Sequence, residues 1–270
     1  MHAAPNNSKY EALRALHQNN TLILPNAWDA ASARVIQQAG FSAIATTSAG
    51  IAFSLGYPDG QRISRQEMLA VVARIAKAVK LPVTADAEAG YGPRPEDAAR
   101  TARDVLAAGA VGMNLEDATG DPQHPLFDLT LQVERIKAVR ELTIVLNART
   151  DVYLLEVGAP EKRYDETVRR LSAYRDAGAD CVFVPGLRDA ATIGRLVKDL
   201  QCPVNILAGP GSPSLPELQE LGVARVSIGS SAMRATLGLL RRIADELKTS
   251  GTYATLEGGI PFADVNHLMD

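Results

Sequence analysis

Carboxylates gather at the ends of two apolar segments in the middle of the chain. One segment ends in Thr84-Ala85-Asp86-Ala87-Glu88 and the next in Asn114-Leu115-Glu116-Asp117. If both are strands, side chains alternate along each, so Asp86 and Glu88 project to the same side. Neighbouring strands lie about 4.8 Å apart, so Glu116 can approach that pair. Several anions in a partly buried space repel one another unless protons or a cation intervene.

Asp86, Glu88 and Glu116 are therefore expected to hold a divalent metal ion. Mg²⁺ is the natural occupant because it prefers carboxylate and water oxygens and usually keeps several waters, and Mn²⁺ is the close substitute. The competing interpretation is that these acids pair with Lys or Arg, or cap the helices that begin just after the strands.

A cationic side chain follows at the next apolar segment, which ends in Asn147-Ala148-Arg149-Thr150-Asp151. This position puts the Arg149 guanidinium beside the proposed metal. Arg149 can bind a substrate carboxylate through two parallel hydrogen bonds, or it can simply neutralise the acids.

Small residues close an earlier apolar segment, where the sequence reads Thr46-Thr47-Ser48-Ala49-Gly50. Ser48, Ala49 and Gly50 would let an anionic substrate approach backbone N–H groups, although such stretches are often plain turns. Asp59 lies in the loop that follows, within LGYPDG. It could face the site, or it could only form a turn between Pro and Gly.

A pattern repeated four times supplies the elements that position these residues. A helical tail, a glycine and an apolar run follow one another in QQAGFSAIATTS, LAAGAVGMNLED, RDAGADCVFVPG and QELGVARVSIGS. Glycine suits the left-handed residue that ends many helices, and the apolar runs suit buried parallel strands. The glycines are Gly40, Gly109, Gly178 and Gly222. Four more apolar runs, near residues 21, 81, 142 and 202, bring the expected strands to eight.

Helical patterns separate these strands, for example at residues 64–80 and 95–109, which begin with Ser or Pro and end in Lys or Gly. Alternating strands and helices predict a parallel sheet, and eight units close it into a single (β/α)₈ barrel of the TIM type. An open doubly wound sheet is the alternative, but no GxGxxG follows the first strand. We expect one domain over residues 1–270, with an eighth helix at about 230–249 and an extra C-terminal helical tail at about 250–270.

Composition narrows the class of partner. The chain has 28 basic and 31 acidic residues, so no overall field points to nucleic acid or to a membrane surface. No apolar run approaches the roughly 20 residues of a membrane span, and the amino terminus lacks the apolar core of a signal peptide. We therefore expect a cytoplasmic protein with a small-molecule partner. Cys181 and Cys202 lie in apolar segments and are interpreted as reduced core residues.

The combination of TTSAG, LGYPD, TADAEAGYG, NLED and NARTD resembles the isocitrate lyase and phosphoenolpyruvate mutase superfamily. The resemblance runs from about residue 20 to IPFADVN near the carboxyl end, and its most specific element is DxExGYG, a variant of the family's DxDxGYG. It implies an Mg²⁺-dependent enzyme that binds a small 2-oxo acid and makes or breaks a C–C or P–C bond. A metal that polarises the 2-oxo group would stabilise the enolate left when that bond breaks.

The resemblance also implies roles for individual residues. Asp86 would touch the metal directly, and Glu88 and Glu116 would hold it largely through waters. Arg149 would grip the substrate carboxylate, the Ser48-Ala49-Gly50 backbone would bind substrate oxygens, and Asp59 would lie near the reacting centre. Family members tend to be tetramers that exchange a C-terminal helix, so a homotetramer with a swapped tail is expected.

One loop departs from the family pattern. The lyases carry Lys-Lys/Arg-Cys-Gly-His after the fourth strand, and its cysteine protonates the enolate, whereas this chain reads DATGDPQHPLFD. This argues against isocitrate or methylisocitrate cleavage and leaves His124 or solvent as the proton donor. The Lys and Asn of the mutase loop are also missing, and Pro185 and Gly186 stand where the lyases hold a Glu.

Three functions remain open at this point. The first is C–C cleavage or decarboxylation of an oxaloacetate-like 2-oxo acid. The second is phosphonopyruvate or phosphoenolpyruvate chemistry at a P–C bond. The third is a 2-oxo-acid binding protein without turnover.

Overall fold

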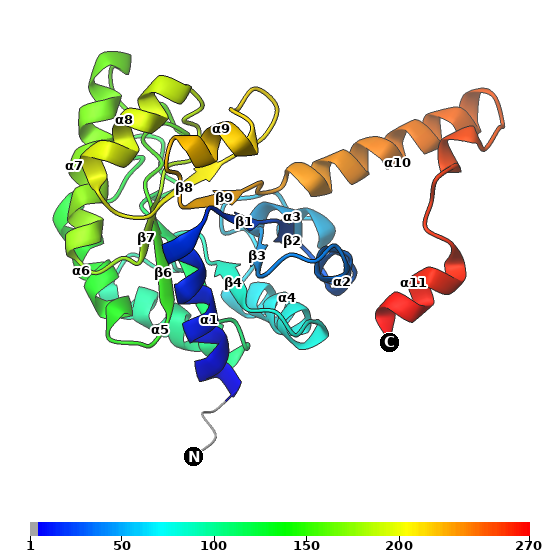
Figure 1. The fold of residues 1–270 in the computed structure, drawn as a ribbon, viewed down its shortest axis with the longest axis horizontal. Helices are drawn as coiled ribbons and strands as arrows, with labels where there is room; N and C mark the ends of the chain where they lie inside the picture. Colours follow the sequence, from blue (N-terminus) through cyan, green and yellow to red (C-terminus); the bar gives the residue numbers. More distant parts are fainter. Residues whose placement is uncertain (1–4) are drawn as a thin grey trace.

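The computed structural model describes residues 5–270, and within them a parallel sheet closes into a barrel surrounded by helices (Figure 1). Residues 1–4, which include His2, lie outside the described part. The strands are β1 (Leu22–Leu24), β2 (Asn26–Ala27), β3 (Ile44–Thr46), β4 (Val83–Asp86), β5 (Gly112–Glu116), β6 (Val145–Arg149), β7 (Cys181–Phe183), β8 (Val204–Leu207) and β9 (Arg225–Ser227). Every strand pairing is parallel, which confirms the predicted (β/α)₈ class.

The first predicted strand is split at Pro25, and its two pieces close the barrel. β1 pairs with β9, whereas β2 pairs with β3. Proline has no N–H group for a ladder hydrogen bond, so a break at this residue leaves no donor unpaired. The Asn26 side chain bridges both neighbours: its Nδ2 donates to the Thr46 carbonyl at 2.8 Å, and its Oδ1 accepts from the N–H groups of Ile228 and Gly229, both at 2.9 Å. The barrel seam is therefore held partly by a side chain.

Helices connect successive strands and cover the outside of the barrel. They are α1 (Pro5–Asn19), α2 (Ala30–Gln38), α3 (Ser48–Ser54), α4 (Arg65–Ala78), α5 (Pro95–Ala107), α6 (Leu129–Arg140), α7 (Pro160–Asp176), α8 (Ala190–Leu200), α9 (Leu215–Glu220) and α10 (Ser231–Thr249). The predicted helices at 64–80 and 95–109 correspond to α4 and α5. Ser64 caps α4 in a capping box with Glu67, and Pro95 opens α5.

The four glycines of the repeated pattern have the expected left-handed backbone, with φ of 84° at Gly40, 89° at Gly109, 103° at Gly178 and 81° at Gly222. A side chain would be strained at each of these positions. The repeated sequence pattern therefore marks the points where a helix ends and the chain turns into the next strand.

Helix α1 closes the barrel end from which the strands start. Tyr10, Leu13 and His17 form its buried face, at a spacing of three and four residues. A methyl group added at Gly112, where β5 begins, would lie 2.9 Å from Leu13 Cδ2. Both cysteines are free thiols, as predicted, with Cys181 buried and Cys202 partly buried.

The tail beyond the barrel projects away from it (Figure 1). Helix α10 extends outward as an arm, a short 3₁₀ turn follows at Ala254–Leu256, and α11 (Phe262–Met269) returns toward α2. Arg34 on α2 donates to the Leu268 carbonyl at 3.2 Å. Among residues 5–270, no helix combines the length and the hydropathy that a membrane span requires.

Candidate active site

Asp86 ends β4 and is held by Ser48, which begins α3, and by Asn114 on β5. The N–H and the Oγ of Ser48 both donate to Asp86 Oδ2, at 3.2 and 2.8 Å. Asn114 Nδ2 donates to Oδ1 at 3.4 Å. These donors are a serine and an asparagine, not a Lys, an Arg or the start of the helix that follows β4, which the alternative interpretation had named.

The small-residue segment is the first turn of α3 rather than a loop. Thr47 is its N-cap, and its Oγ1 accepts from the Gly50 N–H at 3.2 Å. Glycine is required at position 50 because a Cβ there would lie 2.6 Å from Thr47 Cγ2 and 3.0 Å from Trp28 Cβ. The N–H groups of Ser48 and Gly50 thus already have partners, and substrate binding by Ser48, Ala49 and Gly50 stays a prediction.

Glu88 lies beyond the end of β4, so strand alternation does not explain its position. Its backbone is left-handed, with φ of 50°, a conformation that costs a non-glycine residue about 1 kcal/mol or more. Oε1 accepts from the Gln61 N–H at 3.0 Å, and the Gln61 side chain in turn accepts from the Tyr91 N–H at 2.8 Å. The loop that carries Asp59 is thereby tied to the loop after β4.

The Glu88 carboxyl is buried and only half satisfied. Within the described residues, Oε2 has no hydrogen-bond partner of good geometry, and neither has the buried Tyr91 hydroxyl. Burial raises the pKa of Glu88 to about 7, and the charges of Asp86 and Asp59 act in the same direction, whereas the Gln61 N–H opposes it. The site therefore contains a carboxylate oxygen that lacks a positive partner.

Asp59 lies in the loop between α3 and α4, where the residue as a whole is exposed. Desolvation of its carboxyl and then the charge of Asp86 raise the pKa of Asp59. The structure therefore brings Asp59 within electrostatic range of Asp86 and Glu88. Its part in a reaction stays a prediction.

Glu116 and Arg149 face each other at the ends of β5 and β6, where the sheet register pairs them. Arg149 Nη1 lies 2.8 Å from Glu116 Oε2. Asp151 accepts from Arg149 Nε at 2.6 Å and from Nη2 at 2.9 Å, and the guanidinium carbon lies 5.7 Å from the centre of the Phe183 ring. These contacts are those of the alternative role considered for Arg149, in which it neutralises neighbouring acids.

Burial controls the titration of this ion pair. It raises the pKa of Glu116 well above its ordinary value, and Arg149 offsets part of that shift. Burial alone would lower the pKa of Arg149, but Asp151 and Glu116 outweigh it and raise the pKa. The guanidinium is thus a permanent cation beside Glu116, a carboxyl whose pKa is raised by burial.

Among residues 5–270, no three Asp, Glu, His or Cys side chains converge closely enough to form a ready-made metal site. The donor chemistry nevertheless fits a hard cation that keeps its waters, because the set contains only carboxylates and, within the described residues, Glu88 Oε2 is buried with no hydrogen-bond partner of good geometry. Ligands that act through water need not touch a common point. Asp86, Glu88 and Glu116 thus remain the residues suited to such an ion.

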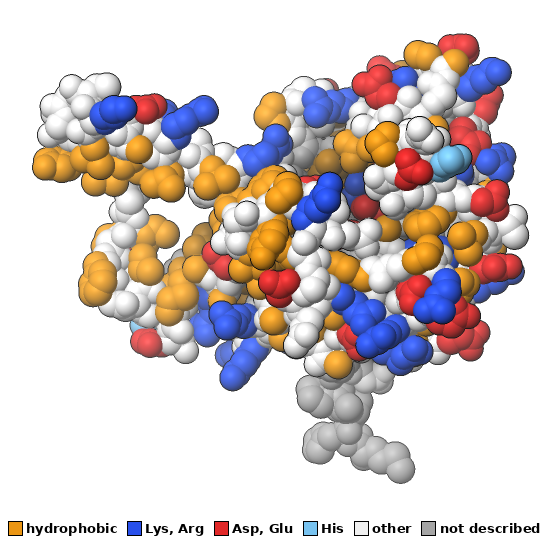
Figure 2. All heavy atoms as spheres, turned by 180° about the vertical axis from the view of Figure 1, so that it is seen from behind, with side chains coloured by type: hydrophobic (Ala, Val, Ile, Leu, Met, Phe, Trp, Pro, Cys, Tyr) orange, Lys and Arg blue, Asp and Glu red, His pale blue; other side chains and the backbone are white. Residues whose placement is uncertain are grey.

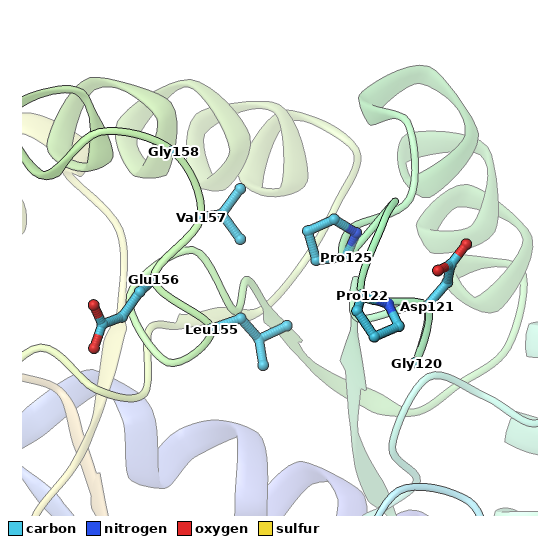
Figure 3. Close-up of a pocket in the computed structure, with 8 residues that line it drawn as sticks. All are labelled: Gly120, Asp121, Pro122, Pro125, Leu155, Glu156, Val157 and Gly158. Atoms are coloured by element: carbon cyan, nitrogen blue, oxygen red, sulfur yellow. The ribbon is translucent and has the colours of Figure 1, made fainter.

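His124 does not lie with these residues. Its side chain is 80% exposed and its Nδ1 lies 3.2 Å from Asp121 Oδ2. The same loop forms one wall of a pocket of about 630 Å³, and the loop after β6 forms the other (Figure 3). The pocket is lined by Gly120, Asp121, Pro122, Pro125, Leu155, Glu156, Val157 and Gly158. It therefore lies beside the acidic site and not within it.

Four residues of this region were not singled out from the sequence: Gln61, Tyr91, Asp117 and Asp151. Tyr91 and Asp151 stand inside the quoted motifs TADAEAGYG and NARTD, and Asp151 alternates with Arg149, so a signal existed for both. Asp117 follows Glu116 directly. For Gln61 we find no sequence signal, because its contact with Glu88 joins two different loops.

The fold and the site define a parallel α/β-barrel enzyme with acids and an arginine at the strand ends. A family model described as phosphoenolpyruvate phosphomutase matches residues 13–248, and the chain belongs to this family of lyase-type enzymes. The resemblance noted in the sequence is thereby confirmed.

Relatives and solved structures agree with this assignment. An uncharacterized protein of Mycobacterium tuberculosis is 37% identical over 89% of this chain and 92% of its own. The 2-methylisocitrate lyase of Escherichia coli is 29% identical, over 88% of this chain and 83% of the lyase. The oxaloacetate decarboxylase of Bradyrhizobium diazoefficiens is 28% identical, over 87% of this chain and 85% of the decarboxylase.

Among solved structures, a Burkholderia cenocepacia protein provisionally assigned as a lyase/mutase superposes with a TM-score of 0.93 at 42% identity, covering 98% of this chain and 96% of that one. Oxaloacetate acetylhydrolase in complex with the product oxalate superposes with a TM-score of 0.85 at 27% identity, covering 97% of this chain and 94% of the hydrolase.

Proposed function

We propose that the chain is an Mg²⁺-dependent lyase that cleaves a C–C bond of, or decarboxylates, a small oxaloacetate-like 2-oxo acid. The observation that carries the proposal is the pairing of Arg149 with Glu116 across neighbouring strand ends, which puts an anion-binding group beside oxygen donors. The similarity to an oxaloacetate decarboxylase and to an oxaloacetate acetylhydrolase with bound oxalate supports this substrate class.

Arg149 has the donors that a substrate carboxylate needs. A guanidinium carries five N–H groups. Asp151 engages two of them and Glu116 faces a third, so two are left for a ligand within the described part of the chain. Two parallel hydrogen bonds from one guanidinium are the strong, oriented way to hold a carboxylate.

Asp86 would hold the cation directly, with Glu88 and Glu116 acting through waters. When bound, the ion would polarise the 2-oxo group and so favour departure of the adjacent carbon. Asp59 and Glu88 have raised pKa values, so each holds a proton more readily than an ordinary carboxyl does. Because the loop after β5 contains no cysteine, we propose that solvent protonates the product, with His124 as the alternative donor.

Chemistry at a P–C bond is the second candidate function, favoured by the match to the phosphoenolpyruvate phosphomutase model. A 2-oxo-acid binding protein without turnover is the third. We also propose a cytoplasmic location, on the absence of a membrane-spanning helix from residues 5–270 and on the balanced charge. Cell fractionation, followed by detection of the protein with an antibody, tests the location.

The substrate test offers the purified protein oxaloacetate, phosphonopyruvate, isocitrate and methylisocitrate with Mg²⁺. We expect turnover of oxaloacetate or a close analogue. Rapid isocitrate cleavage would overturn our interpretation of the loop after β5. Turnover of phosphonopyruvate alone would select the second candidate.

The binding test titrates oxalate by calorimetry with and without Mg²⁺. Asp86→Ala is expected to abolish the Mg²⁺-dependent part of binding, whereas Asp121→Ala, at an exposed acid of a neighbouring loop, is the matched control. Arg149→Lys keeps the charge but loses the forked geometry, so it should weaken oxalate binding about tenfold or more. Unchanged affinity in Asp86→Ala would refute the metal assignment. Oxalate binding in the absence of any turnover would select the third candidate.

A further inference from the structure

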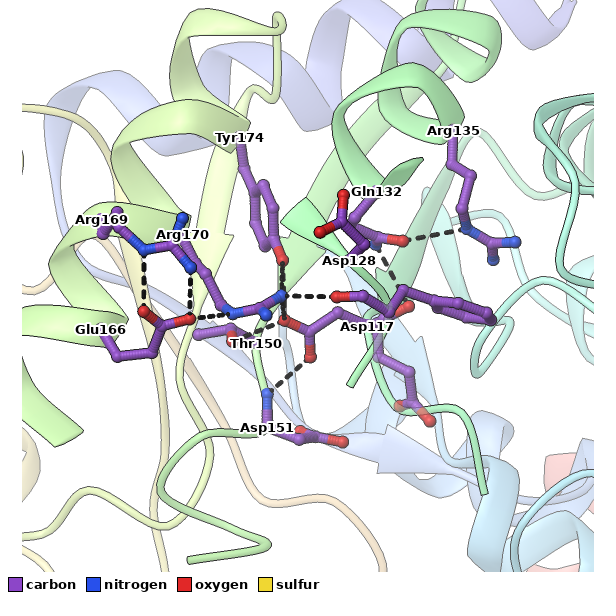
Figure 4. A network of polar contacts seen from close by, with 12 residues as sticks. Asp117, Asp128, Gln132, Arg135, Thr150, Asp151, Glu166, Arg169, Arg170 and Tyr174 are labelled. Carbon is purple, nitrogen blue, oxygen red and sulfur yellow. Dashed lines mark hydrogen bonds and ion pairs between the residues drawn. The ribbon is translucent and has the colours of Figure 1, made fainter. Parts of the chain in front are cut away.

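A buried network of polar side chains joins the end of β5, the end of β6 and helix α7 (Figure 4). Its centre is Asp117, the residue after β5, whose side chain is completely buried. Four groups donate to its carboxylate: Thr150 Oγ1 at 2.7 Å, the Asp151 N–H at 3.0 Å, Tyr174 Oη at 2.7 Å and Arg170 Nη1 at 3.2 Å.

Two of these donors belong to the segment that carries Arg149. Thr150 and Asp151 follow Arg149 directly, and both are buried. Asp117 therefore fixes the backbone and one side chain at the end of β6. Asp151 then holds the Arg149 guanidinium through two hydrogen bonds. A continuous path of short contacts runs from Asp117 through Asp151 to Arg149.

The other two donors come from α7 and anchor Asp117 itself. Arg170 Nη1 also donates to the Phe127 carbonyl at 3.0 Å, and its Nε donates to Glu166 at 2.6 Å. The Phe127 N–H donates to the Asp117 carbonyl at 2.8 Å. Helix α7 thus connects the loop after β5 with the loop after β6, which are the two walls of the pocket in Figure 3.

We propose that Asp117 is a positioning residue that aligns Arg149 for anion binding by fixing Asp151, with Tyr174 and Arg170 as its anchors on α7. The inference rests on the proposed anion-binding role of Arg149. A fold-stabilising role alone would not need the path to end on a guanidinium that keeps two N–H groups for a ligand. A carboxylate with four donors is also a group that an amide cannot replace, because an amide nitrogen would face a donor.

Three variants separate positioning from general stability. Tyr174→Phe removes one donor and keeps the shape of the ring. Asp117→Asn keeps the volume and disrupts the centre of the network. Thr167→Val is the matched control, because Thr167 lies on the same helix, is completely buried and has no hydrogen-bond partner for its hydroxyl within the described residues.

The first measurement is the oxalate affinity, determined by calorimetry in the presence of Mg²⁺. A titration with Mg²⁺ alone gives the Mg²⁺ affinity as its control. We expect Tyr174→Phe to weaken oxalate binding about fivefold to tenfold and to leave Mg²⁺ affinity unchanged, whereas Thr167→Val changes neither. In an Arg149→Ala background, Tyr174→Phe should have no further effect on oxalate affinity, because the effects of substitutions at residues that act through one another do not add. An effect of the same size in both backgrounds, or equal affinities for Tyr174→Phe and Thr167→Val, would overturn the proposal.

A ligand-free measurement keeps the two proposals apart. If the wild-type protein does not bind oxalate, the proposed function fails and the positioning role is decided by crystal structures of Asp117→Asn, or of Tyr174→Phe if the former does not fold. We expect the Arg149–Asp151 pair to be displaced in the variant and intact in Thr167→Val. An intact pair in the variant refutes the positioning role whatever the ligand is.

Discussion

His17 lies on the inner face of α1 with its ring buried against the barrel. Its Nδ1 is 2.9 Å from the Leu13 carbonyl oxygen, to which it donates as the neutral ring. Burial lowers the pKa of His17 to about 4, and the Arg225 charge acts in the same direction. The buried ring therefore resists protonation, although His17 takes no part in the site.

This predicts a pH dependence of stability. Because the folded pKa of about 4 lies below the ordinary value of 6.5, the unfolded chain binds more protons between these pH values. Neutral His17 makes its full contribution to the free energy of unfolding above pH 6.5. This contribution falls as the pH drops toward 4, by up to about 3 kcal/mol. Urea unfolding of wild type and His17→Asn at pH 7, 5.5 and 4 measures it. A difference between the two proteins that stays constant over this range would contradict the assignment.

For single residues of the site, the sequence predicted types and positions better than it predicted contacts. Asp86, Glu116 and Arg149 lie where the strand-end argument put them, because the period of a strand and the register of a parallel sheet are local properties. The contacts of Glu88 could not be predicted, since they depend on a left-handed backbone and on Gln61 from another loop. The engagement of Arg149 by Asp151 likewise follows from side-chain geometry that spacing does not encode.

Among the elements, α1 is the one whose sequence says least about its role. It closes the barrel end opposite to the site, since its contacts are with residues that begin strands or precede them: Lys9 Nζ with the Val79 carbonyl, Leu13 with Gly112, and Arg14 with Asp180. Leu13 is completely buried in a cluster with Leu22, Leu24 and Val145. Helix α1 should therefore serve stability alone.

Leu13→Ala is expected to destabilise the protein by about 3 kcal/mol, because it removes a buried leucine and leaves a cavity. Oxalate affinity in the presence of Mg²⁺ should not change. Denaturant unfolding and calorimetry measure the two quantities, and Glu11→Ala, on the exposed face of the same helix, is the control. A loss of oxalate affinity at full folding would show that α1 communicates with the site.

Elements were predictable where a pattern is repeated and less so where it is interrupted. The glycine before each of four strands marked the helix ends, since the left-handed turn demands it. The break at Pro25 and the start of α3 at Ser48 were missed. Each depends on a side chain, Asn26 in one case and Thr47 in the other, that takes over backbone hydrogen bonds.

The whole molecule exposes more surface than a compact monomer would. Its accessible area is 13708 Å², whereas about 11,300 Å² is expected for a compact chain of 28.8 kDa. The arm contributes to this surface, and its inner side carries hydrophobic side chains (Figure 2). Leu237, Leu240 and Leu247 are 43%, 60% and 48% exposed, and Phe262 in α11 is 83% exposed. Such a patch is typical of a surface that another chain covers.

We propose that the arm and tail pack against other copies of the chain in a homotetramer, with α11 exchanged between subunits. Leu240→Glu should shift the protein toward smaller species, because it places a charge in the apolar stripe. Arg242→Glu, on the opposite face of α10, should leave the assembly intact. Light scattering coupled to gel filtration measures both. A monomeric wild type, or equal masses for the two variants, would refute the assembly.

The left-handed residues around Glu88 also limit how far the protein can be made heat-resistant. Gln61, Glu88 and Tyr91 all have positive φ, at 56°, 50° and 55°, and two hydrogen bonds join them. Glycine at any of these positions would relieve strain of roughly 1 kcal/mol. It would also delete a side chain or a hydrogen bond that shapes the site. At Tyr91 the lost packing would outweigh that gain. A screen for higher melting temperature should therefore enrich glycine at Glu88, whose buried carboxyl is only half satisfied, and a screen for activity should remove it.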